Sequence, residues 1–133
     1  MQGEPRALDW HGLETAGDAQ PPFRWSGPSL RPRILVPFMG DSRARLTLHM
    51  GRFDPADNLG RIRILVNNVE IDQVDRHEGT QGLDLAFVAP LRPGRASVVQ
   101  LILSAAYCPD EHVRNGDQRQ LGVMLMGFSI APE

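Results

Sequence analysis

Two short motifs carry the side chains best suited to binding a ligand. In FRWSGPS, Trp25 follows Arg24, and an exposed indole beside a guanidinium would offer a stacking platform for a sugar ring. In NGDQRQLG, Asp117 and Arg119 follow a turn at Asn115-Gly116 and would line a polar groove. Each motif also has a structural interpretation, which we favour: Trp25 fills the core, and Asp117 and Arg119 stabilise the turn.

No group of residues has the spacing of a known catalytic or metal-binding motif. The phosphate loop, the G-x-S-x-G turn, the zinc-protease motif and paired cysteines are all missing from the sequence. The loop with Asp54, Asp57 and Asn58 is rich in oxygen ligands but lacks calcium-loop spacing. We therefore expect no catalytic residue, no metal, no cofactor and no enzymatic activity. The histidines are scattered and are expected to be surface or hydrogen-bonded residues: His11, His49, His77 and His112.

Composition and charge exclude several classes of partner. The 133 residues include 14 arginines, no lysine and 16 acidic residues, which gives a net charge of −2. This balance lacks the basic excess that binding to nucleic acid or to an anionic membrane needs. The N-terminal MQGEPRALDWHGLE has no apolar signal-peptide run, and Cys108 is the single cysteine, which precludes an internal disulfide. We expect a soluble, cytoplasmic protein.

The elements that must position these residues are strands, because apolar residues recur with a period of two. Residues 43–50 (RARLTLHM) and 61–66 (RIRILV) alternate in this way, and His49 should face outward from its strand. Asn67-Asn68 predicts a tight type I′ hairpin, because asparagine tolerates the positive φ that this turn requires. Further strands are expected in five segments: 23–25, 34–38, 83–88, 96–104 and 121–131.

These strands and the Gly-rich and Pro-rich loops between them predict the fold class. We expect an all-β protein, a two-layer antiparallel β-sandwich of jelly-roll or galactose-binding-like type, with about seven or eight strands. No segment shows the 3.6-residue period, so helix should be confined to single turns. Residues 1–20 are interpreted as an N-terminal arm and linker, and residues 21–133 as the sandwich domain.

The order of the motifs also carries a resemblance. Five segments follow one another along nearly the whole chain: DWHGLE, FRWSGPS, ILVPF, a Val-Asn-Asn hairpin and DQRQLGVMLMGFSI. The most specific points are Arg24-Trp25 followed by Gly27, and the run made by Asp117, Arg119, Leu121 and Gly122. This order resembles an uncharacterised bacterial β-sandwich module that accompanies glycosyltransferases and surface-polysaccharide proteins. The resemblance implies a non-catalytic carbohydrate-binding or accessory module of bacterial glycan metabolism, with a glycan or a glycosyltransferase as partner.

An alternative is a protein-interaction or oligomerisation sandwich without a small-molecule ligand. Leu65, Val88 and Val99 depart from the alternation and would form an outward apolar patch. Such a patch, or an exposed edge strand, would pair with a second copy of the chain or with another protein. The residues alone leave both functions open.

Overall fold

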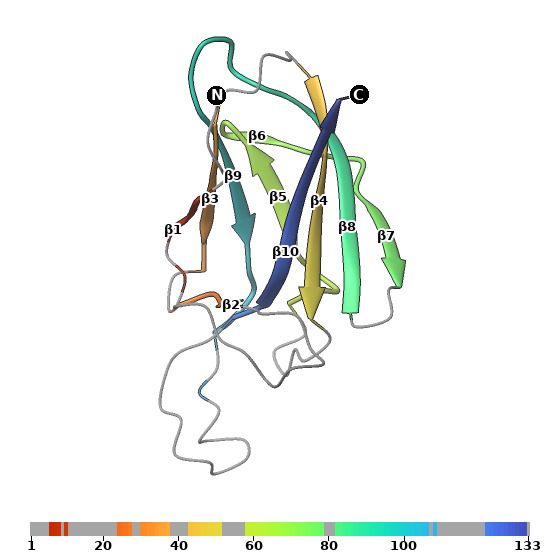
Figure 1. The fold of residues 1–133 in the computed structure, drawn as a ribbon. Coiled ribbons are helices and arrows are strands. Elements are labelled where there is room, and N and C mark those ends of the chain that lie inside the picture. The colour runs from red at the N-terminus through yellow and green to blue at the C-terminus, as the bar shows by residue number, and fades with distance from the viewer. Residues whose placement is uncertain are drawn as a thin grey trace, which may run out of the picture.

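The computed structural model describes residues 6–8, 10, 24–27, 30–37, 43–51, 58–78, 82–106, 108 and 122–132. Within them the chain forms ten strands and no helix (Figure 1). The first sheet contains, in spatial order, β1 (Arg6–Leu8), β3 (Arg33–Val36), β9 (Ser97–Ile102), β5 (Arg63–Val66) and β6 (Val69–Glu70). The second sheet contains β2 (Arg24–Trp25), β10 (Met124–Pro132), β4 (Arg43–Gly51), β8 (Gly82–Pro90) and β7 (Asp75–Glu78).

Every strand pair is antiparallel, so the predicted all-β antiparallel sandwich is confirmed. Among the described residues the strands outnumber the expected seven or eight, because β1 and β7 were not expected, whereas β2 lies in the expected segment 23–25 and β6 in the expected hairpin. Both unexpected strands lie at sheet edges. The three residues of β1 are too few to show a period, and the DRHE of β7 contains no apolar residue to show one.

The hydrophobic core lies between the two sheets. Inward-facing side chains alternate along β4 and β5 as the period-two pattern predicts. Val99 also faces this core with no exposed surface, so the prediction that it belongs to an outward patch is wrong. The single cysteine, Cys108, is buried as well. The largest fully buried side chains are Phe87, Ile34, Leu46, Leu48, Met50, Ile64, Leu85, Leu101, Val36, Val66 and Val99.

The β5–β6 connection is the predicted hairpin. Asn67 and Asn68 have φ values of 50° and 69°, the two positive angles that a type I′ turn requires. Asn67 also ties the turn to the neighbouring strand, because its Oδ1 accepts a hydrogen bond of 2.9 Å from the backbone N–H of Val98. The hairpin is therefore anchored to β9 at its turn as well as along β5.

No helix among the described residues has the length and apolar character needed to cross a membrane.

Candidate functional site

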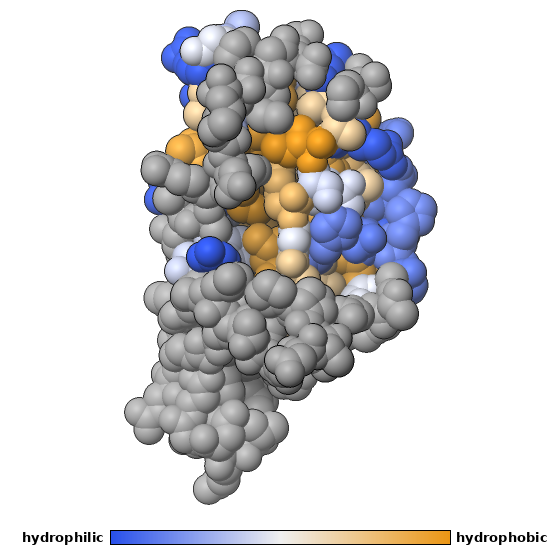
Figure 2. Space-filling model, viewed as in Figure 1, coloured by the Kyte–Doolittle hydropathy of each residue, from blue (hydrophilic) through white to orange (hydrophobic). Residues whose placement is uncertain are grey.

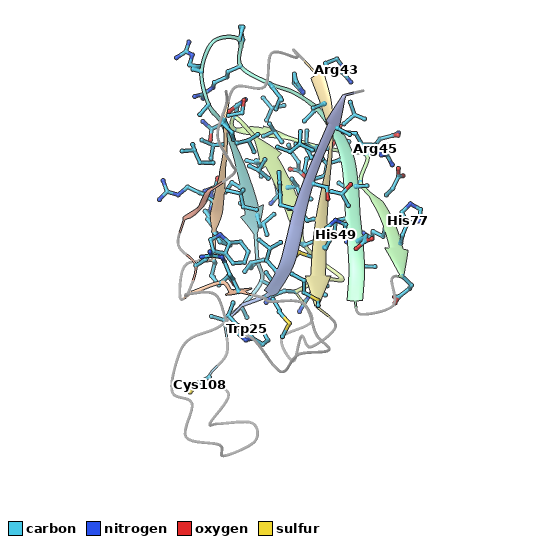
Figure 3. The ribbon with its side chains drawn as sticks, viewed as in Figure 1. Trp25, Arg43, Arg45, His49, His77 and Cys108 are labelled. Atoms are coloured by element: carbon cyan, nitrogen blue, oxygen red, sulfur yellow. The ribbon has the colours of Figure 1, made fainter. Side chains whose placement is uncertain are left out.

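The outward surface of the second sheet, here called the polar face, gathers the charged and hydroxyl side chains of four strands. Alternation along β4, β8, β7 and β10 turns these residues away from the core. Figure 2 shows hydrophilic surface concentrated over β7 and β8, and Figure 3 shows His49 and His77 midway along the sheet with Arg45 and Arg43 towards its upper end. The residues of the polar face are Arg43, Arg45, Thr47, His49, Asp75, His77, Asp84, Ala86, Val88, Gly127, Ser129 and Ala131.

A hollow of about 480 Å³ opens at one end of the polar face. It forms because β7 pairs with β8 only from Leu83 to Ala86. The last residues of β8, after Ala86, therefore have no partner residue in β7. Residues 71–74 cross from the first sheet to the second beside this gap. The hollow is lined by Arg43, Arg45, Glu70, Ile71, Asp72, Gln73, Asp75, Phe87 and Val88.

The hollow is bordered by charges of both signs. Arg45 Nη2 lies 3.4 Å from Asp75 Oδ2, and both side chains are about half exposed, at 47% and 63%. This contact passes over Ala86, which pairs with Thr47 and Asp75 in the adjacent strands. Ala86 points away from the core but is only 5% exposed. The pair and its neighbours therefore cover this part of the sheet surface.

A second ion pair fixes one carboxylate of the hollow. Arg63 Nε donates to Glu70 Oε2 at 3.2 Å, and Nη2 of the same guanidinium donates to Oε1. These hydrogen bonds, with the Coulombic attraction, lower the pKa of the Glu70 carboxyl and raise the pKa of Arg63. Glu70 is therefore a carboxylate at neutral pH. Asp72, also in the lining, is exposed.

A hydrogen-bonded chain of three side chains crosses the centre of the polar face. His49 Nδ1 lies 2.9 Å from Asp84 Oδ1, and His49 Nε2 lies 2.9 Å from Ser129 Oγ. The side chains of His49 and Asp84 are 40% and 38% exposed. The outward orientation predicted for His49 is confirmed, whereas its two partners, 35 and 80 residues away, were not foreseen.

The predicted ligand-binding residue Trp25 is buried, with 7% of its surface exposed. It lies in β2 opposite Met124, and half-buried Arg24 lies opposite Leu125. Figure 3 places Trp25 at the end of the sandwich opposite to Arg43, away from the hollow. A buried indole cannot stack on a sugar ring, so the geometry favours the interpretation of Trp25 as core. Asp117 and Arg119 lie outside the described residues.

Gly122, the last residue of the second motif of the resemblance, contacts the first motif next to Trp25. Ser26 is fully buried, exchanges backbone hydrogen bonds with Val123 and Gly122, and its Oγ accepts from the Val123 N–H at 2.8 Å. A Cβ on Gly122 would collide with the Ser26 hydroxyl and the side chain of Leu103. Glycine is thus required at Gly122 for close packing. This junction has a structural role that accounts for Gly122 without a ligand.

Asn58, the oxygen ligand considered for calcium, has a structural role. Its side chain is fully buried and contacts four backbone groups: the N–H groups of Ser104 and Ala105 and the carbonyls of Ala105 and Gly122. An amide with every hydrogen-bonding group occupied has none left for a cation. Asp54 and Asp57 lie outside the described residues. Within the described part of the chain, no group of three or more His, Cys, Asp and Glu residues could hold a metal ion.

No protein-family model, no curated protein and no solved structure matches the chain.

Proposed function

We propose that this chain is a carbohydrate-binding module that holds a polyhydroxylated ligand in the hollow beside the polar face. The observation that supports this function is that two guanidinium groups, on β4, and three carboxylates, at residues 70, 72 and 75, line one open hollow. A sugar hydroxyl both donates and accepts hydrogen bonds. Carboxylates accept in two directions and guanidiniums donate in a planar fork, so together they match adjacent hydroxyls on a ring.

The size and the lining of the hollow support a small polar ligand. Its volume of about 480 Å³ is within the range of small-molecule sites. Phe87, the single aromatic residue in the lining, is 2% exposed and faces the core, so stacking contributes little. Binding would therefore rest on hydrogen bonds made in competition with water, for which we expect weak affinity. The ligand would be a bacterial glycan or a glycosyltransferase substrate, and the module would act in the cytoplasm beside such an enzyme.

A glycan-array screen followed by calorimetric titration with the selected glycan tests the proposal. Asp72→Asn keeps the side-chain size and removes the charge, whereas Arg45→Gln removes the charge and shortens the side chain. Each should weaken binding by about tenfold, the value of one charge-assisted hydrogen bond. Arg95→Gln is the matched control, because Arg95 is an exposed arginine in the loop between β8 and β9. Binding that survives both hollow variants, or an array without any hit, would contradict the proposal.

One observation favours the alternative of a protein-interaction module. The outward surface of the first sheet carries four half-buried apolar side chains: Leu35, Leu65, Val98 and Ile102. Leu35 pairs directly with Val98 across the strands. Of the residues expected in an outward patch, Leu65 belongs to this surface and Val88 lines the hollow. A size-exclusion measurement that gives a dimer for the native chain and a monomer for Leu65→Glu would support this alternative.

A further inference from the structure

We infer that Ser129 is a nucleophile activated by His49 and Asp84, and that it accepts an acyl group from small carboxylic esters and passes it to water. This activity goes beyond ligand binding in the hollow and does not depend on it. The observation that carries it is the unbroken chain from the Asp84 carboxylate through the imidazole of His49 to the Ser129 hydroxyl, with 2.9 Å at each contact. Serine hydrolases on unrelated folds activate their nucleophile by the same order of contacts.

The Asp84 carboxylate determines which atoms of the three hydrogen-bonded side chains carry the hydrogens. An ionised Asp84 can only accept, so the Nδ1 atom of His49 carries the hydrogen. The Nε2 atom of a neutral ring is then an acceptor, and Ser129 must donate to it. This is the protonation state in which a histidine can take the serine proton during attack on a carbonyl.

Sheet register places a base beside Ser129. Ser129 pairs with Thr47 of β4, whereas His49 and Arg45 lie two residues to either side of Thr47 on the same surface. Diagonal neighbours in a sheet are about 7–8 Å apart, within reach of a long side chain. The imidazole of His49 spans this gap to Ser129, whereas the guanidinium of Arg45 extends the other way, across β8 to Asp75 on β7.

Gly127 provides the room that the imidazole needs. It pairs with His49, and a Cβ at this position would come within 3.3 Å of His49 Cδ2. Any larger residue would press on the ring from the β10 side. The glycine thus leaves the ring free to lean over β10 and reach Ser129 two residues further along the strand.

The reaction balances with water as the only co-substrate. Ser129 Oγ attacks the ester carbonyl carbon as its proton passes to His49 Nε2. The bond from that carbon to the alcohol oxygen then breaks, and the imidazolium returns the proton to the departing alcohol. Water then attacks acyl-Ser129 and gives a proton to His49 Nε2. The carboxylic acid leaves, and the proton returns to Ser129 Oγ, so ester and water become acid and alcohol.

Covalent labelling measures this reactivity directly. The intact chain is treated with a fluorophosphonate probe, the modified serine is located by mass spectrometry, and p-nitrophenyl acetate hydrolysis is followed in parallel. We expect Ser129 to be labelled about 100-fold faster than Ser104, the range that a positioned base contributes. Ser104 is a suitable control because it is exposed and lies outside the strands. Ester hydrolysis should fall to the background rate in Ser129→Ala and stay unchanged in Ser104→Ala.

Two further variants test the partners of Ser129. His49→Gln should reduce labelling to the rate of Ser104. Asp84→Asn should slow labelling by a similar factor, because an amide at this position donates to Nδ1 and moves the ring hydrogen to Nε2. The ¹⁵N shifts of His49 report this tautomer change, and the labelling rate of Ser129 is the readout that a merely structural role would not move. Circular dichroism checks that each variant is folded.

Three results would each overturn the inference: labelling of Ser129 no faster than that of Ser104, labelling that persists in His49→Gln, or hydrolysis that persists in Ser129→Ala. Because the probe and the test ester are not carbohydrates, a failure here leaves the proposed glycan binding untouched, and a negative glycan screen leaves this inference untouched.

Discussion

Trp25 closes one end of the sandwich, where the short strand β2 joins the last strand. Its side chain is 7% exposed, and the neighbouring Ser26 places both its backbone and its hydroxyl in hydrogen bonds to the segment before β10. Trp10 approaches the same place through an isolated bridge to Ser26, and its Nε1 donates to the Arg33 carbonyl at 3.0 Å. Trp10 thus links β3 of the first sheet to the segment that follows β2 of the second, next to Trp25.

Trp25→Ala should lower the free energy of unfolding by about 3 to 5 kcal/mol, because it removes a large buried ring and leaves a cavity. Urea denaturation followed by circular dichroism measures the change. Val69→Ala is the control, since Val69 is 62% exposed and its truncation should cost less than about 0.5 kcal/mol. A denaturation midpoint that Trp25→Ala leaves unchanged would show that the indole is not part of the core.

At the residue scale the sequence predicts which way a side chain faces better than it predicts which residues that side chain contacts. Alternation along residues 43–50 is enough to predict that His49 faces outward. Its contacts with Asp84 and Ser129 depend on the register of β8 and β10 beside β4, which is set by pairs far apart in the chain. The hollow is a similar case. It exists because β7 begins opposite Ala86 and leaves the end of β8 without a partner in β7, and no local pattern encodes that offset.

At the scale of elements, the turn at Asn67-Asn68 was the most predictable feature. Two residues with positive φ between two apolar runs have few alternatives in an antiparallel pair. The edge strands β1 and β7 were the least predictable, because β1 has only three residues and β7 has no apolar residue, so neither shows a period. Local chemistry thus predicted the long strands and the hairpin, whereas tertiary pairing determined the edges.

The two turn residues should respond differently to glycine. Asn68→Gly removes a Cβ from a position with φ of 69° and should raise the free energy of unfolding by about 0.5 kcal/mol. Asn67→Gly relieves similar strain but removes the acceptor for the Val98 N–H, so it should lower that free energy by about 1 kcal/mol. Thermal denaturation of both variants gives the comparison. Equal effects at the two positions would contradict a specific anchor to β9.

At the scale of the whole molecule, the chain passes from one sheet to the other at every connection except the β5–β6 and β7–β8 hairpins. Neither sheet can therefore be completed without the other, and their inward faces share one core. A shared core and repeated crossings favour a single cooperative unfolding transition. Arg76 adds a polar link between the sheets, because it extends from β7 to the Leu59 and Ile62 carbonyls in the segment before β5, at 3.0 and 3.4 Å.

Arg76→Met should test this cooperativity, because it keeps the aliphatic stem and removes the guanidinium that links the sheets. We expect the free energy of unfolding to fall by about 1 to 2 kcal/mol, the range for hydrogen bonds to a charged group that remains partly solvated. Arg95→Met, at an exposed loop arginine, should change it by less than about 0.5 kcal/mol. Circular dichroism reports all strands, whereas tryptophan fluorescence reports the end that holds Trp10 and Trp25. The two signals should share one midpoint in the variant, and separate midpoints would mean that the sheets open as independent units.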